Sequence, residues 1–168
     1  KAAGYQVGLI GTVQYEIGDT VKPSKNTTPL PAEYFALLAE MRDAGCTHVV
    51  MEVSSFGLEQ RRIGDTRFTA AVFTNLTQDH LDIHGTMENY YQAKRMLFDL
   101  CGYAVVNVND SYGKRLLSEI SCEKAGYGLN VPEAEISASD ITLRAAGTQF
   151  TLTAFGRAIP VTMRMTGL

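Results

Sequence analysis

The sequence lacks long hydrophobic runs. Its 168 residues contain no stretch of about 18 apolar residues, the length that a transmembrane helix requires. The N-terminus has no charged segment followed by an apolar one, so no signal peptide is expected. These absences predict no membrane association.

Cysteines are few, and neither sign of charge is in large excess. Fifteen Lys and Arg residues against eighteen Asp and Glu residues give a net charge of −3, so no basic field is present to bind nucleic acid. The three cysteines (Cys46, Cys101 and Cys122) are odd in number and widely spaced. They favour a reducing, cytoplasmic location over a disulfide framework or a zinc site.

Both ends of the sequence are typical of a piece cut from a longer chain. Residues 1–4 are typical of the last turn of a helix with a glycine stop, and the other end shows no terminating element. The apolar fraction of 45% is ordinary for one globular domain. We therefore expect residues 1–168 to be part of a longer enzyme.

The hydrophobic pattern over residues 1–126 predicts alternating strands and helices. Strands are expected at 6–12, 47–53, 68–74 and 104–108, a hairpin at 13–24, and helices at 32–44, 87–100 and 110–120. The strand at 47–53 is almost continuously apolar, as a strand covered on both faces would be. This order predicts an α/β fold with a parallel sheet flanked by helices.

The pattern changes after about Tyr127. Three short strands are expected there, at 136–143, 149–155 and 158–165, with turns at Gly147 and Gly156. Residues 127–168 are therefore expected to form a small antiparallel β-sheet appended to the α/β part.

A carboxylate follows one of the apolar strands. Glu52 lies at the C-terminal end of the strand at 47–53, the edge where ligands bind in open α/β sheets. A buried carboxylate there requires a cation or a metal. A strand-end glutamate that reaches solvent is the alternative.

A polar segment follows the strand at 68–74. Asp79, His80, Asp82 and His84 could supply oxygen and nitrogen ligands to a metal ion. The alternative is a polar loop that caps the next helix.

A lysine occurs among apolar residues on the helix at 87–100. Its neighbours at helical spacing are Tyr90, Tyr91, Leu97 and Phe98. Desolvation of Lys94 would lower its pKa and expose a neutral amine, which can react with carbon dioxide to form a carbamate. A lysine that extends to water is the alternative.

Hydroxyl, amide and guanidinium groups form a further candidate site for phosphate or carboxylate recognition. They belong to Ser54, Ser55, Gln60, Arg61 and Arg62, and Thr27 and Thr28 are further candidates. The alternatives are a helix cap at Ser54 or Ser55 with a solvated basic turn, and turn residues at Thr27 and Thr28.

These segments together resemble the Mur ligases, ATP-dependent enzymes that build the peptide stem of peptidoglycan. The matching text is Asn26-Thr-Thr-Pro29, MEVSSFGL at 51–58 with Gln60 and Arg62, FTNLTQDHLDIHG at 73–85, and YYQAK at 90–94. The resemblance implies the family's central ATP-binding domain, which is P-loop NTPase-like. The nearest branch adds meso-diaminopimelate or L-lysine to UDP-MurNAc-L-Ala-D-Glu through an acyl phosphate.

The resemblance also implies roles for individual residues. Glu52, His80 and Lys94, the last as its carbamate, would be catalytic and would hold Mg²⁺ at the phosphates of ATP. The UDP-MurNAc-dipeptide would contact Thr27, Thr28, Ser54, Gln60 and Arg62. ATP, Mg²⁺, the dipeptide and an amino acid are thus the expected ligands.

The sequence departs from the family in four respects. No G-x-x-x-x-G-K-S/T pattern is present, and the N-terminal uridine-binding and C-terminal domains are absent, so we expect residues 1–168 alone to be inactive. In the segment NVND at 107–110, Asn109 stands where relatives have an acid, so no role is transferred.

Three other functions remain open from the sequence. One is another Mur-type or folylpolyglutamate-type ligase. The second is a metal-dependent hydrolase built on Asp79, His80, Asp82 and His84. The third is a non-catalytic binding module.

Overall fold

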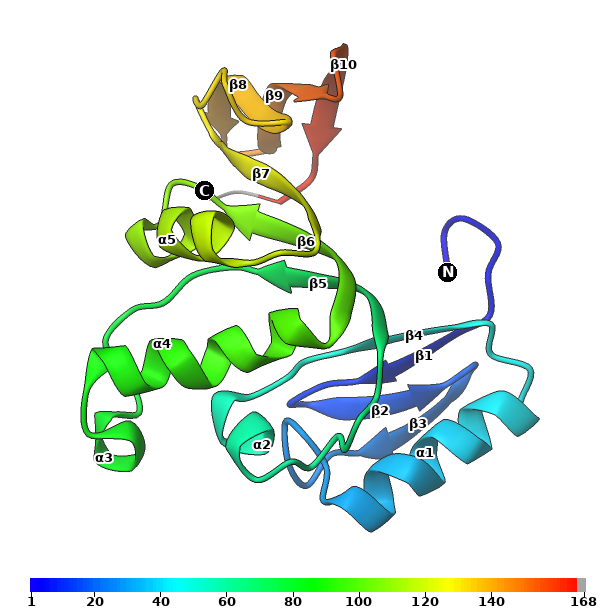
Figure 1. Ribbon diagram of the computed structural model, residues 1–168. Helices are drawn as coiled ribbons and strands as arrows, with labels where there is room; N and C mark the ends of the chain where they lie inside the picture. Colours follow the sequence, from blue (N-terminus) through cyan, green and yellow to red (C-terminus); the bar gives the residue numbers. More distant parts are fainter. Residues whose placement is uncertain (166–168) are drawn as a thin grey trace. The chain divides into compact units, whose positions relative to one another are not determined.

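The computed structural model describes residues 1–165, which divide into two compact units (Figure 1). Unit 1 comprises residues 1–66 and 80–97, and unit 2 comprises residues 67–79 and the chain from residue 98 onward. Each unit has its own sheet, and the alternation of strands and helices confirms the expected α/β class. No helix in the described part of the chain has the length and apolarity needed to cross a membrane.

The sheet of unit 1 has the strand order β3-β2-β1-β4. Its strands are β1 (Val7–Ile10), β2 (Gln14–Ile17), β3 (Thr20–Pro23) and β4 (His48–Met51). The hairpin expected at 13–24 is confirmed as β2 and β3. β1 and β4 run parallel, and their register pairs Ile10 with Met51, so the carboxyl ends of these strands lie side by side.

Helix α1 (Pro31–Asp43) connects β3 to β4 and covers the sheet of unit 1 with Tyr34, Leu37 and Met41. Proline at its first position fits a helix start, because that amide has no partner within the helix. A Cβ at Gly8 would lie 2.4 Å from the Met41 sulfur. Glycine in β1 therefore lets the helix approach the strand closely.

The expected burial of the strand at 47–53 is wrong. His48, Val49 and Val50 are exposed, and the His48 ring contacts the Tyr5 ring in a tilted arrangement, with 4.3 Å between centroids. β4 is the edge strand of its sheet, so its side chains lack a neighbouring strand on one side.

Unit 1 also contains three further helices, α2 (Ser55–Glu59), α3 (Leu81–His84) and α4 (Met87–Arg95). Both α2 and α3 pack against α4 (Figure 1). The Ser54 hydroxyl caps α2 by accepting the Gly57 N–H at 3.1 Å, and Thr86 caps α4 in the same way. The helix expected at 87–100 is observed as α4 followed by a 3-10 turn, η1 (Met96–Asp99).

The sheet of unit 2 has six strands in the order β10-β9-β8-β7-β6-β5. They are β5 (Phe68–Phe73), β6 (Cys101–Asn107), β7 (Glu123–Leu129), β8 (Ile136–Arg144), β9 (Gly147–Ala154) and β10 (Arg157–Met163). Neighbours from β5 to β8 are parallel, and those from β8 to β10 are antiparallel. Helix α5 (Ser111–Glu119) connects β6 to β7 and buries Leu116.

The C-terminal strands β8 to β10 are antiparallel, as expected, and they continue the parallel sheet of unit 2 through β8. β8 pairs in parallel with β7, with Tyr127 opposite Ile136, and the Glu135 carboxylate accepts the Gly126 N–H at 2.7 Å beside this junction. The sequence analysis missed β7, whose glycines at 126 and 128 obscure the pattern. The boundary expected between 126 and 127 falls within β7 and stays a prediction, and residues 166–168 lie outside the described chain.

Candidate active site

Glu52 directly follows β4 and is held by the neighbouring strand's end. The Thr12 N–H donates to Glu52 Oε2 at 3.0 Å, and the Thr12 hydroxyl donates to the same oxygen. Thr12 Oγ1 also lies 3.0 Å from Thr27 Oγ1. Glu52 is exposed, so of the two interpretations of this residue the structure agrees with a strand-end glutamate that reaches solvent.

Thr12 was not among the residues expected at this site. Its position at the end of the strand expected at 6–12 could have identified Thr12 as a site residue, because the carboxyl ends of adjacent parallel strands meet at one edge of the sheet. Together with Glu52, it borders a cavity of about 320 Å³ within unit 1. The cavity is lined by Leu9, Gly11, Thr12, Val13, Gln14 and Glu52.

Thr28 joins Glu52 to the start of α2. Its side chain is fully buried, and its hydroxyl donates to the Glu52 carbonyl at 3.3 Å and accepts the Ser54 N–H at 2.9 Å. The Ser54 hydroxyl donates to Thr28 Oγ1 at 3.1 Å. A Cβ at Gly57 would lie 2.8 Å from Thr28 Cβ, so this junction depends on glycine.

Arg62 extends the network beyond α2. Its Nη1 donates to the Thr28 carbonyl at 2.9 Å, and its Nε donates to Gln60 Oε1 at 2.9 Å. Its guanidinium lies 5.1 Å from the centroid of the Phe56 ring, at cation–π distance. All five residues expected to contact the dipeptide therefore belong to one continuous network with Glu52.

The other two expected metal-site residues share a contact with one aromatic ring. Tyr90 is buried, and the centroid of its ring lies 5.9 Å from that of His80, in an edge-to-face arrangement. The Lys94 Nζ lies 5.3 Å from the Tyr90 centroid. Lys94 is half-buried, and His80 is the left-handed N-cap residue of α3, with φ of 53°.

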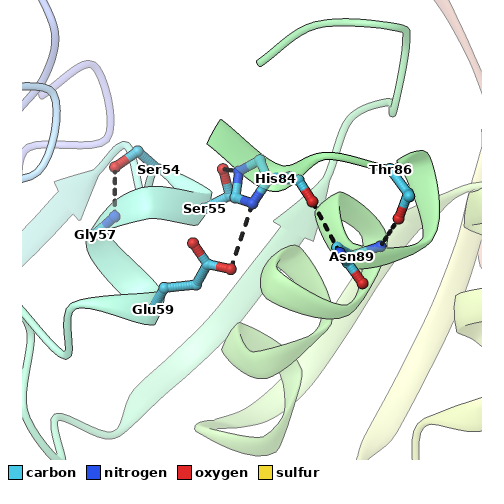
Figure 2. Close-up of polar contacts among 7 residues, drawn as sticks. All are labelled: Ser54, Ser55, Gly57, Glu59, His84, Thr86 and Asn89. Carbon is cyan, nitrogen blue, oxygen red and sulfur yellow. Dashed lines mark hydrogen bonds and ion pairs between the residues drawn. The ribbon is translucent and has the colours of Figure 1, made fainter. Parts of the chain in front are cut away.

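His84 is buried against α2 (Figure 2). Its Nε2 lies 2.9 Å from the Ser55 hydroxyl, and its Nδ1 lies 3.3 Å from a Glu59 oxygen. His84 is thus turned away from a metal site shared with the exposed His80 and Asp82. Within residues 1–165, no three His, Cys, Asp or Glu side chains converge as metal ligands.

The segment at 107–110 in unit 2 has a structural role. The Asn107 amide donates to the Thr74 carbonyl at 2.8 Å, and the Asn109 side chain pairs with both backbone groups of Leu129. Asp110 caps α5 at the Gly113 N–H and accepts the Leu76 N–H, each at 3.0 Å. These three side chains tie together the ends of β5, β6 and β7.

Comparison with known proteins identifies the family. The full sequence, residues 1–168, matches the Mur ligase middle domain. The chain belongs to this family. The Mur ligase relatives include a UDP-N-acetylmuramoyl-L-alanyl-D-glutamate--2,6-diaminopimelate ligase of Clostridium tetani, 39% identical over 99% of this chain and 34% of its own length.

Solved Mur ligase structures have the same fold. A structure of a UDP-N-acetylmuramoyl-L-alanyl-D-glutamate--2,6-diaminopimelate ligase has a TM-score of 0.83 and 27% identity, over 98% of this chain and 34% of its own. The MurF ligase of Thermotoga maritima in complex with ADP has a TM-score of 0.65 and 18% identity, over 96% of this chain and 35% of its own. This chain therefore spans about a third of the length of the relatives it matches.

Proposed function

We propose that this chain is the middle domain of an ATP-dependent ligase that joins 2,6-diaminopimelate to UDP-MurNAc-L-Ala-D-Glu. Family membership and the names of relatives near 40% identity support the reaction class and the amino acid. The observation that carries the proposal is the continuous network joining Glu52 to Thr28, Ser54 and the residues beyond α2. It unites residues from separate segments in the pattern that the family resemblance implies.

The proposed reaction begins with a carboxylate, which is a poor electrophile. ATP would phosphorylate the dipeptide carboxylate to an acyl phosphate, and the amine of the incoming amino acid would then displace phosphate. The two anionic reactants repel each other, so their approach requires positive charge and fixed donors. Arg62, held by the Thr28 carbonyl and Gln60, would supply an oriented guanidinium to the dipeptide.

The residues around Glu52 fit Mg²⁺. This ion commonly binds one or two carboxylates and completes its shell with water and phosphate oxygens. Glu52 supplies one carboxylate, and the hydroxyls of Thr12 and Thr27 lie beside it. When bound, Mg²⁺ neutralises phosphate charge during the transfer. Glu52 would hold it, with His80 and Lys94 serving a second ion.

Lys94 is the residue expected to carry a carbamate. Its Nζ lies 5.3 Å from the centroid of the Tyr90 ring. The ammonium would lose one proton before its nitrogen bonds to the carbon of CO₂, and the carbamic acid so formed would lose a second proton to solvent to give the anionic carbamate. A bound cation near Lys94 would favour that anion, so the modification stays a prediction tied to metal binding.

We also propose that residues 1–168 do not turn over ATP alone. The sequence contains no P-loop pattern, and the chain covers only about a third of the length of its relatives. A cytoplasmic location is part of the proposal. A sister ligase and a binding module are the alternatives that the experiment below distinguishes.

Phosphate release tests the proposal in the full-length protein. Release should require ATP and UDP-MurNAc-L-Ala-D-Glu together with diaminopimelate, and lysine should not replace it. Lys94→Ala should abolish release, and bicarbonate should not restore it, whereas Lys25→Ala, an exposed lysine of unit 1, should match wild type. No release with either amino acid, in a folded protein that binds ATP, would favour a sister ligase with another acceptor.

A further inference from the structure

The buried His84 ring connects α3 to two other helices. Its side chain has no exposed surface, and it contacts Ser55 and Glu59 of α2 on its edge. Its face stacks on Tyr90 of α4, with centroids 4.8 Å apart and planes 10° apart. Figure 2 shows the imidazole between the two α2 side chains. One ring thus contacts residues from two separate helices.

The contacts of His84 with a serine on one side and a glutamate on the other resemble a hydrolytic triad, but the geometry does not support that chemistry. Ser55 is buried at 5% exposure, and it does not line the neighbouring cavity of about 510 Å³ that His84 and Glu59 border. The Glu59 oxygen lies 3.3 Å from Nδ1 but off the N–H direction, so Nδ1 has no hydrogen-bond partner. A substrate could not reach the Ser55 oxygen.

The contacts instead fix the short helix α3. A helix of four residues has too few internal hydrogen bonds to hold its own position, so tertiary contacts must place it. The His80 carbonyl accepts the N–H groups of Ile83 at 3.1 Å and His84 at 3.0 Å. Residues 80–84 therefore form one closed turn, with His80 at one end and the buried His84 at the other.

The same contacts reach the two other parts of the site. Tyr90, which stacks on His84, also contacts the His80 ring and lies beneath Lys94. The Asn89 amide donates to the His84 carbonyl at 2.9 Å and so joins the end of α3 to α4 (Figure 2). On the other side, Ser55 follows Ser54, which is bonded to Thr28.

We propose that His84 is a positioning residue that fixes His80 and Lys94 relative to the dipeptide-binding end of α2, acting through Ser55 and Tyr90. The inference rests on the proposed ligase function. His84 itself touches no substrate. Its loss should loosen the turn that carries His80, and it should weaken metal binding more than dipeptide binding.

The test uses the full-length ligase with His84→Phe, which keeps an aromatic ring on Tyr90 but removes both polar contacts with α2. Ser55→Ala removes the hydrogen bond alone. His48→Phe is the matched control, because His48 is exposed and lies outside the network. Each variant is assayed for kcat, for the KM of the dipeptide and for the Mg²⁺ concentration at half-maximal rate. The shift in Tm caused by Mg²⁺ with a non-hydrolysable ATP analogue gives a readout without turnover.

His84→Phe should raise the half-saturating Mg²⁺ concentration by roughly tenfold and lower kcat, with the KM of the dipeptide within about twofold, because small displacements of catalytic groups are costly. Ser55→Ala should show a smaller change in the same direction. The Mg²⁺-dependent shift in Tm should shrink in both variants and remain in His48→Phe.

Two results would overturn the positioning role. One is an unchanged Mg²⁺ requirement with a lower Tm, which would mean that His84 only stabilises the fold. The other is an equal rise in the KM of the dipeptide, which would mean a general loosening of the site. Failure of the proposed function is a different result, because wild type itself would then show no ligation.

Discussion

Polar clusters at the strand ends of the two units differ in the groups to which their side chains hydrogen-bond. At the ends of β1 and β4 in unit 1, side chains hydrogen-bond to one another as well as to backbone groups: Thr12 pairs with Glu52 and Thr27, and Ser54 pairs with Thr28. After β6 in unit 2, Asn107, Asn109 and Asp110 bond to backbone groups. A ligand can replace a side-chain partner at the surface, whereas backbone groups would lose the bonds that hold the fold.

The comparison shows that position at a strand's end does not identify a binding site. Both clusters occupy the kind of edge where α/β proteins bind ligands. The partners of each side chain distinguish them. In unit 1, Glu52 is exposed and borders a cavity, so its carboxylate is accessible to a cation. The side chains of the unit 2 cluster are already hydrogen-bonded to backbone groups of their own unit.

Glu52→Gln should give the largest effect and separate the clusters most clearly. In the full-length ligase, loss of the carboxylate should lower kcat by about 100-fold or more, as loss of one electrostatic group in an active site does. The free energy of unfolding should change by less than about 0.5 kcal/mol, because Glu52 is exposed. Glu133→Gln, an exposed carboxylate of unit 2, is the control and should have no effect on rate. A rate within threefold of wild type would remove Glu52 from the site.

Gly57→Ala should damage the unit 1 cluster through packing. The new methyl would lie 2.8 Å from Thr28 Cβ and 2.9 Å from Ser54 Oγ, so both must move. Overpacking should cost about 1–3 kcal/mol of unfolding free energy, measured by urea denaturation. The KM of the dipeptide should rise as well. Gly102→Ala, whose nearest contact would be an ordinary 3.4 Å, is the control. An unchanged KM would show that Thr28 does not shape the substrate site.

Asp110→Ala should destabilise unit 2. It removes the cap of α5 and leaves the Leu76 N–H without its acceptor, so the unfolding free energy should fall by about 2 kcal/mol. Asp110→Asn should retain part of this stability, because asparagine is also a good cap. Asp65→Ala, in an exposed loop, controls for loss of a carboxylate. A loss below about 0.5 kcal/mol for Asp110→Ala would contradict a structural role for this cluster.

The smallest expected effect is a change in how fast the Cys101 thiol of unit 2 reacts with an alkylating reagent. Burial, with the neighbouring Cys122 thiol 3.8 Å away, raises the pKa of Cys101 to about 11. Its alkylation by iodoacetamide, followed by mass spectrometry, should therefore accelerate steadily from pH 8 to pH 10. Cys122→Ser should accelerate the reaction at pH 8 by removing the thiol's contribution, although burial remains the larger cause. A rate that levels off below pH 9 would contradict the raised pKa.

The same shift sets the sign of a pH effect on stability. The unfolded thiol ionises near its ordinary pKa of 9.0, whereas the folded thiol stays protonated to about 11. The unfolded state therefore binds fewer protons in this range, and stability should fall as pH rises from 9 toward 11. Cys101→Ser should flatten that slope.

Local patterns predicted most elements of the fold. The helix expected at 32–44 is α1, and the cap expected at Asp110 starts α5, because both depend on neighbours within a few residues. The pattern did not reveal β7, whose glycines pack against Val108 and Asn109. It also did not reveal that β8 continues the parallel sheet, because strand pairing is a long-range property.

By itself, the sequence determined the α/β class, the candidate side chains and the family resemblance. Residue types and short spacings carry that information. Only the tertiary structure decided which candidates meet: it joined Glu52 to Thr12, enclosed His84 between Ser55 and Tyr90, and assigned the polar residues at 107–110 to the backbone of unit 2. These pairings join residues far apart along the chain. Strand register and helix packing bring them together, and local sequence does not encode either one.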